Sequence, residues 1–135
     1  MRAMVIESKR LVLREVPVPE PRFGEVLVRL FATAANRADL LQVAGLYPAP
    51  EDVPQDIPGL EFSGVIERLG EGVTEWKSGD LVSGLVGGGA YAEFVRTPAR
   101  AVSLSPRGVS PIAAAALPEA LLTAYDAIVA QGGLK

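Results

Sequence analysis

The chain contains neither cysteine nor histidine, and these two absences exclude several kinds of chemistry. Without cysteine it forms no disulfides, so nothing in it requires an oxidising compartment. Without either residue, a tetrahedral zinc site would need four carboxylates, which is not how proteins bind zinc. Ser-His-Asp and Cys-His nucleophiles are excluded for the same reason. We therefore expect any catalysis to use positioning, hydroxyls, amides, carboxylates or a bound cofactor.

An excess of positive charge and an uninterrupted membrane-spanning segment are missing too. The 135 residues include 13 Lys+Arg and 16 Asp+Glu, a net charge of −3, whereas binding of nucleic acid needs a basic stripe. The longest apolar stretch, from Pro111 to Ala130, is interrupted by Pro118, Glu119 and Asp126, which argues against a membrane span. Charge also interrupts the N-terminal segment too early for a signal peptide. We expect one soluble, cytoplasmic domain with neither nucleic-acid nor membrane partners.

The chain up to about residue 104 is predicted to form short β-strands separated by turns. Alternating or β-branched apolar residues predict strands at Arg2–Ile6, Leu11–Val16, Glu25–Ala32, Ser63–Leu69, Leu81–Leu85, Ala90–Arg96 and Ala101–Leu104. The Gly87-Gly88-Gly89 triplet predicts a hairpin turn rather than a phosphate-binding loop, because it lacks the P-loop lysine and the strand–GxGxxG–helix context. Many short strands with turns between them favour a β-barrel or a sandwich.

Two parts of the chain have helical periodicity. Asn36–Ala44 begins with a residue suited to the N-cap and ends before a glycine. Leu40, Leu41 and Val43 are expected to supply its apolar face. Near the C-terminus, Ser110-Pro111 is typical of a helix start. Pro118–Gln131 then has apolar residues at helical spacing. The proline-rich, acidic stretch Leu46–Pro58 predicts an ordered loop between strands.

Taken singly, the polar residues that stand out have ordinary explanations. Glu61 is a lone carboxylate among apolar residues, where a paired structural acid is commoner than a catalyst. Asp39 fits a first-turn helix charge. Thr123 fits a surface or back-bonding residue of a helix. For the loop residue Tyr47, a structural and a functional role are equally favoured.

The order and spacing of the motifs are more specific than any one of them. The set comprises Asn36-Arg37-Ala38-Asp39, Gly45-Leu46-Tyr47, Pro58-Gly59-Leu60-Glu61-Phe62-Ser63-Gly64, Gly72-Val73, Lys77-Ser78-Gly79-Asp80, Gly89-Ala90-Tyr91-Ala92-Glu93, Leu117-Pro118-Glu119-Ala120 and Thr123-Ala124-Tyr125. This set resembles the N-terminal half of the zinc-free medium-chain dehydrogenases/reductases, in particular the p53-inducible type of NADPH:quinone oxidoreductase. Zinc-binding members have a Cys-His pair where this chain has Asn36-Arg37, so the resemblance implies a site without metal.

The resemblance implies a mainly β fold with short helices, namely a GroES-like, partly open β-barrel followed by C-terminal helices. Residues 1–117 would be the catalytic-side domain. Residues 118–135 would be a bridging helix toward a Rossmann domain that is absent from this chain. That domain would carry the dinucleotide fingerprint. The apolar face of the bridging helix makes a homodimer possible.

The resemblance also implies hydride transfer from the cofactor NADPH to a small-molecule quinone. Asn36 and Tyr47 would be the catalytic residues, lining the nicotinamide and substrate pocket, and Thr123 would lie near the nicotinamide carboxamide. Glu61 would hold the substrate pocket together with Tyr47 rather than react. Without the Rossmann domain, we expect this chain to bind NADPH weakly or not at all.

Two other interpretations stay open at this point. In the first, the chain is a non-enzymatic, stand-alone GroES-like module for binding or assembly. In the second, it belongs to a reductase of enones or enoyl thioesters. An assay that compares a quinone with an enone would separate the last interpretation from quinone reduction.

Overall fold

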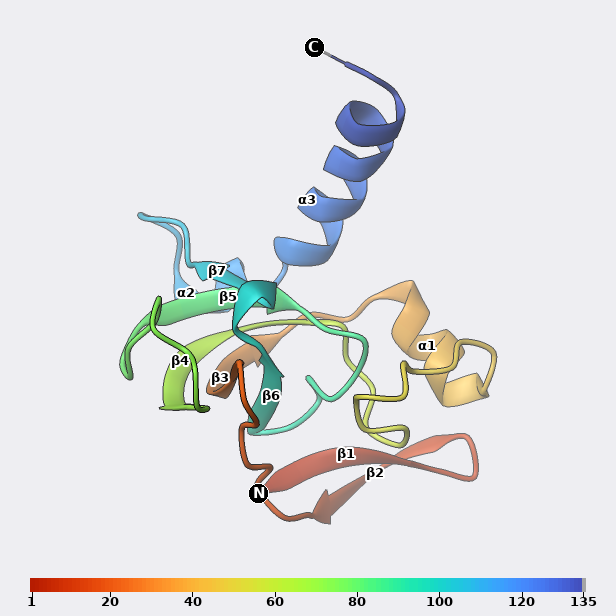
Figure 1. Cartoon of the computed structure of the whole chain (residues 1–135). Coiled ribbons are helices and arrows are strands. Elements are labelled where there is room, and N and C mark those ends of the chain that lie inside the picture. Colours follow the sequence, from red (N-terminus) through yellow and green to blue (C-terminus); the bar gives the residue numbers. More distant parts are fainter. Residues whose placement is uncertain (135) are drawn as a thin grey trace.

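Two open antiparallel β-sheets make up most of the structure, a computed structural model that describes residues 1–134 (Figure 1). A two-stranded sheet pairs β1 (Arg2–Glu7) with β2 (Arg10–Glu15). A five-stranded sheet has the order β6-β3-β4-β5-β7. Its strands are β3 (Glu25–Thr33), β4 (Glu61–Leu69), β5 (Leu81–Leu85), β6 (Phe94–Pro98) and β7 (Val102–Leu104). The predicted mainly β class is thus confirmed, with open sheets in place of a closed barrel.

The main core lies on one face of the five-stranded sheet. β3 and β4 are its longest strands, and both lie inside the sheet, where apolar side chains exclude water from the ladder. Val26, Val28, Phe62, Ile66 and Val82 are all at most 1 % exposed and pack together there. Alternate residues of one strand point to the same face, so the spacing of Val26 and Val28 places both in this core.

The β1–β2 hairpin is fastened to the main body at two places. Ala3 forms an isolated antiparallel bridge with Ala92, and the Met4 amide donates to the Tyr91 carbonyl at 2.8 Å. Ala3 and Val5 are buried with Ile57 in a second, smaller apolar cluster. The hairpin therefore covers the loop that leads into β4.

The Gly87-Gly88-Gly89 triplet does not form the predicted hairpin turn. β5 and β6 are not neighbours, because β6 pairs with β3 while β5 lies between β4 and β7. The segment therefore crosses from one side of the sheet to the other. Its backbone bonds to the loop before β4, where the Gly89 amide donates to the Ile57 carbonyl at 2.7 Å. This pairing also explains why β6 begins only at Phe94 rather than at Ala90.

The helices begin and end close to the predicted residues. α1 (Arg37–Ala44) has Asn36 as its N-cap and a left-handed glycine as its C-cap. A 3₁₀ turn, η1, covers Ala99–Ala101. α2 (Pro111–Ala114) is capped by the Ser110 hydroxyl, which accepts from the Ala113 amide at 3.2 Å. α3 (Pro118–Tyr125) continues as a π-helix, η2 (Asp126–Gln131).

α3 and η2 together project from the body of the molecule (Figure 1). Pro118 is the buried residue of α3, whereas Leu121, Tyr125 and Ile128 are each more than half exposed. By length and composition alone, Pro111–Gln131 is apolar enough to cross a membrane, with a mean hydropathy of 1.5, although soluble core helices meet the same criterion. A turn after α2 divides this stretch before α3 begins. Lys135, the last residue of the predicted bridging segment, lies outside the described residues.

Candidate functional site

A buried carboxylate, that of Glu61, joins three parts of the structure. Glu61 is the first residue of β4, pairs with Leu85 of β5, and is 2 % exposed. Its Oε1 accepts from Asn36 Nδ2 at 2.8 Å, and its Oε2 accepts from the Glu119 amide at 2.9 Å. Its backbone carbonyl accepts from the Thr33 hydroxyl at 2.7 Å. β4, the N-cap of α1 and the first turn of α3 therefore meet at one side chain.

The Asn36 side chain is held by Glu61 instead of capping its own helix. Asn36 has the extended backbone of an N-cap but makes no side-chain capping bond. The Asp39 carboxylate binds the backbone at this end of the helix, because its Oδ2 accepts from the backbone N–H of Asn36 at 2.7 Å. A carboxylate oxygen accepts hydrogen bonds, so the bond to Glu61 orients the side-chain amide of Asn36 with its Nδ2 toward Glu61. The half-buried Asn36 thus has its Oδ1 turned away from Glu61.

A second buried carboxylate, that of Asp39, lies on the other side of Asn36. Asp39 is 2 % exposed, and its Oδ2 also accepts from the Tyr91 hydroxyl at 3.0 Å. Burial, with the negative charge of Asp39 beside the phenol, raises the pKa of Tyr91 to about 12. Within residues 1–134, neither Asp39 nor Glu61 forms an ion pair. Both carboxylates accept from neutral donors, which confirms that Glu61 is paired, whereas its role stays a prediction.

Thr123 is connected to this network through Glu119. The Thr123 hydroxyl donates to Glu119 Oε1 at 3.3 Å, one helical turn away on α3. Its side chain is exposed on the projecting helix. The structure therefore brings Asn36 and Glu61 into contact, and Thr123 is linked to Glu61 only through the intervening Glu119.

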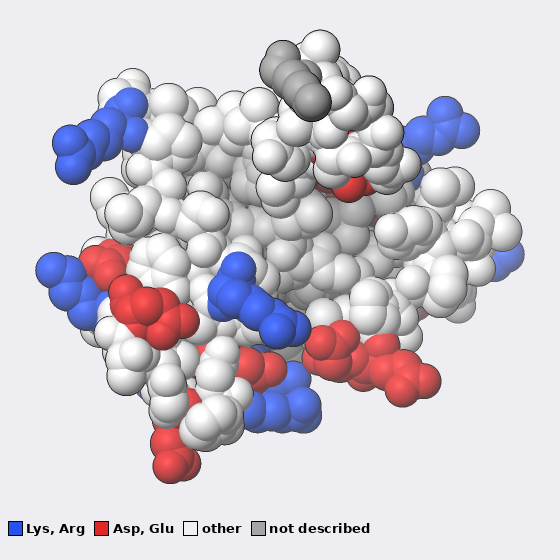
Figure 2. Space-filling model, turned by 45° about the horizontal axis from the view of Figure 1, so that its top comes forward, with Lys and Arg blue, Asp and Glu red and all other residues white. Residues whose placement is uncertain are grey.

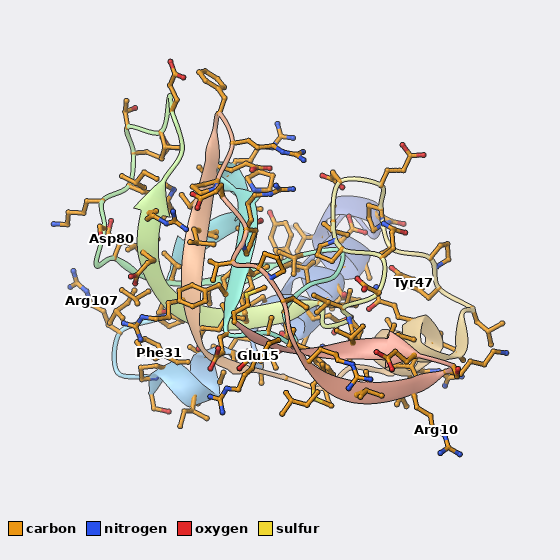
Figure 3. The ribbon with its side chains drawn as sticks, turned by 90° about the horizontal axis from the view of Figure 1, so that it is seen from below. Arg10, Glu15, Phe31, Tyr47, Asp80 and Arg107 are labelled. Atoms are coloured by element: carbon orange, nitrogen blue, oxygen red, sulfur yellow. The ribbon has the colours of Figure 1, made fainter. Side chains whose placement is uncertain are left out.

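Tyr47 lies apart from the other predicted site residues. It follows α1 on a loop at the edge of the molecule (Figure 3). Its ring is 45 % exposed and lines a hollow of about 200 Å³ with Gln42, Pro48 and Pro58. No hydrogen bond joins Tyr47 to Asn36 or Glu61 within the described chain.

The buried face of α1 is polar, which the sequence analysis missed. Asp39 and Gln42 are buried, whereas Leu40 is 72 % exposed, so the expected apolar face is wrong at this residue. Gln42 Nε2 donates to the Gly87 carbonyl at 2.9 Å. Residues three apart on a helix share a face, so the spacing of Asp39 and Gln42 was an available signal. The crossing segment supplies the partner that makes this burial favourable, and its course was not predictable from local sequence.

The chemistry of the site is that of amides, hydroxyls and carboxylates. Within residues 1–134, no group of three or more Asp or Glu side chains is placed to hold a metal ion. Figure 2 shows acidic and basic side chains scattered over the face that it presents, with no patch of one sign. Such a site is able to orient a neutral or delocalised ligand.

Comparison with known sequences identifies relatives across almost the whole chain. The family model described as the alcohol dehydrogenase GroES-like domain matches residues 22–107. The mouse protein named synaptic vesicle membrane protein VAT-1 homolog-like is 37% identical over 129 residues, which cover 93% of this chain and 31% of the mouse protein. The chloroplast envelope quinone oxidoreductase homolog of Arabidopsis thaliana is 37% identical over 126 residues, which cover 90% of this chain and 38% of the plant protein. The chain spans about a third of the length of these relatives.

Solved structures with the same fold extend to the end of the chain. An NAD-dependent alcohol dehydrogenase superposes with a TM-score of 0.88 at 30% identity, covering 100% of this chain and 48% of its own. A mycobacterial protein complexed with NADPH superposes with a TM-score of 0.85 at 30% identity, covering 100% of this chain and 43% of its own. In both cases the match is to somewhat less than half of the solved protein.

Proposed function

The chain belongs to the family of alcohol dehydrogenase GroES-like domains, and from this premise we propose that it forms the substrate side of an NADPH-dependent quinone oxidoreductase. Its relatives make it an oxidoreductase-type domain of the medium-chain dehydrogenase/reductase superfamily. The name of the Arabidopsis relative supports a quinone as the substrate, and the mycobacterial complex supports NADPH as the cofactor. When bound, the nicotinamide would supply the hydride.

The observation that carries the proposal is the fixed orientation of the Asn36 amide. Glu61 is buried and holds this amide at 2.8 Å, so Asn36 presents its remaining acceptor in one direction. The nicotinamide carboxamide carries both donors and an acceptor, and an oriented amide is complementary to such a group. The hydroxyl of Thr123 lies next to the same network, where it donates to the side chain of Glu119. These donor and acceptor groups fit a nicotinamide ring without any metal.

Quinone reduction suits a site that lacks histidine and cysteine. A quinone that accepts one hydride and one proton becomes a hydroquinone, and water is able to supply the proton. The protein then contributes mainly orientation, which is worth up to about 7–11 kcal/mol in well-aligned reactions. We assign this role to Asn36 and Tyr47, with Glu61 holding the pocket.

The test measures NADPH oxidation by the complete gene product, with a quinone and an enone as alternative acceptors. We expect Asn36→Ala to lower kcat/KM with the quinone at least tenfold, and Tyr47→Phe to raise KM several-fold at unchanged unfolding free energy. Phe23→Leu, at an aromatic residue that is 76 % exposed and lies outside α3, is the control and should leave both constants unchanged. Unchanged kinetics of the Tyr47 variant with several quinones would remove that residue from the site, and turnover of the enone alone would replace the quinone.

The 135-residue chain by itself should bind NADPH poorly. The dinucleotide fingerprint, a strand followed by a glycine-rich turn and a helix that receives the pyrophosphate, does not occur in its sequence. We expect no saturation by NADPH at micromolar concentrations in calorimetric titration. Clear micromolar binding would mean that this domain alone holds the cofactor.

A further inference from the structure

We propose that Glu61 is a positioning residue that couples α3 to Asn36, so that the placement of this helix sets the placement of the Asn36 amide. The inference rests on the proposed function, in which Asn36 lines the nicotinamide and substrate pocket. It assigns Glu61 a positioning role at that site in addition to holding the pocket, because its two carboxylate oxygens bind different elements.

One oxygen holds α3 where the helix leaves the body. Beyond its first turn the helix is exposed and projects into solvent (Figure 1). The attachment therefore depends on the buried Pro118 and on the 2.9 Å bond from the Glu119 amide to Glu61 Oε2. A negative charge at the first turn of a helix is also favoured by the helix dipole. A displacement of the projecting part of α3 therefore acts on the hydrogen bond between Glu119 and Glu61.

The other oxygen holds Asn36, and the two oxygens belong to one rigid planar group. Asn36 Nδ2 lies 2.8 Å from Glu61 Oε1. The backbone of Glu61 is fixed by pairing with Leu85 and by the Thr33 hydroxyl. The carboxylate therefore responds by rotating about its own bonds, and a rotation that moves Oε2 also moves Oε1. A shift of α3 must either break the bond to Glu119 or displace the Asn36 amide.

The exposed apolar face of α3 is a surface through which a contact could displace the helix. Leu121, Leu122, Tyr125 and Ile128 are each more than half exposed and lie along one side of the projecting helix with Val129. A surface of this kind changes its environment when another part of a protein covers it. If covering this face moved α3, the two bonds of Glu61 would pass that movement to Asn36.

Amide hydrogen exchange in the 135-residue chain tests the coupling directly. Glu61→Leu removes both accepting oxygens, so the backbone amide of Glu119 should exchange at least tenfold faster. Asn36→Ala releases Oε1 and frees the carboxylate to rotate, so the same amide should exchange at least threefold faster although Asn36 does not touch it. Thr33→Val is the matched control, because it removes a bond to the Glu61 backbone and not to the carboxylate. It should leave the Glu119 rate within twofold.

The Ile66 amide in β4 reports whether a variant has loosened the whole sheet, and rates are compared after normalising to it. If Glu61→Leu does not fold, the exchange rate of the Glu119 amide in Asn36→Ala is the test of the coupling. An unchanged Glu119 rate in Asn36→Ala overturns the coupling, since Glu61 would then only anchor the helix. The experiment contains no nicotinamide, so its failure is distinguishable from failure of the proposed function, which is measured by NADPH oxidation.

Discussion

The surroundings of Tyr91, its burial and the nearby Asp39, change the pH at which its hydroxyl loses a proton. The Tyr91 hydroxyl donates to a carboxylate that is 2 % exposed. Burial and the charge of Asp39 raise the pKa of Tyr91 to about 12, whereas a tyrosine in the unfolded chain has its ordinary pKa of 10.0. Between these two values the folded chain keeps a proton that the unfolded chain releases. The stability from this contact is therefore complete below pH 10 and declines as the pH rises toward 12.

We predict that Tyr91→Phe lowers the free energy of unfolding by about 1–2 kcal/mol at pH 8, because a hydrogen bond to a charged acceptor is lost. The difference between wild type and variant should shrink as urea unfolding is repeated at pH 10 and above. Tyr125→Phe, at an exposed side chain, should show neither effect. A difference that stays constant up to pH 12 would contradict the assigned contact.

The sequence predicts that the buried acid of the site is hydrogen-bonded, but it does not predict which residues bind it. The apolar surroundings of Glu61 in the sequence predict a paired acid, and the structure confirms this. Its partners lie 25 and 58 residues away along the chain, where local patterns carry no information. The same is true of Tyr91, which is 52 residues from Asp39. Whether Asn36, Tyr47 and Thr123 bind a cofactor stays a prediction.

At the scale of the element, alternation and capping residues were sufficient for most strands and helices. β5 and α1 lie where apolar alternation and an N-cap with a terminal glycine place them. The exception is the segment between β5 and β6, where three glycines predict a hairpin although the chain crosses the sheet. Glycine permits many turns, and the choice among them depends on long-range pairing with the loop before β4.

The turn between β1 and β2 holds two non-glycine residues in an unfavourable backbone region. Ser8 has φ 49° and Lys9 has φ 61°, as in the type I′ turns that favour Asn-Gly. We predict that Lys9→Gly raises the free energy of unfolding by about 0.5–1 kcal/mol, because the left-handed conformation costs other residues energy. Thermal unfolding measures the change.

Lys77→Gly is the matched control for this prediction, because Lys77 immediately precedes a turn, at Ser78 and Gly79, and its φ is not positive. Glycine at such a position adds freedom to the unfolded chain and should lower the stability slightly. Equal effects of glycine at Lys9 and Lys77 would refute the strain in the hairpin turn.

At the scale of the whole molecule, stabilising burial is concentrated in the sheets and is almost absent from the projecting helix. Leu27 in β3 is completely buried, whereas Leu121 in α3 is 59 % exposed. We predict that Leu27→Ala costs about 2–5 kcal/mol of unfolding free energy, the usual range for a core leucine. Leu121→Ala should change it by less than about 0.5 kcal/mol. Urea unfolding at two protein concentrations measures both.

A cost above about 1 kcal/mol for Leu121→Ala, rising with protein concentration, would show that a second copy covers α3. That outcome would support the homodimer as a proposal for this chain. A cost independent of concentration would instead mean that the helix packs on its own domain in solution. The matched pair of leucines thus separates core packing from association.

The open edges of the sheets have a consequence for aggregation. An uncovered strand edge is a template for strands of other molecules unless it is short, charged or ended by proline. β7 has three residues, β6 ends at Pro98, and β2 carries Arg10, Arg14 and Glu15. Each of these three edges therefore has one of these protections against fibril growth, and β1, the fourth edge, is bridged to Ala92. Colloidal behaviour should accordingly be governed by the apolar surface of α3, and mutations that make this helix more polar should raise solubility more than changes at the strands.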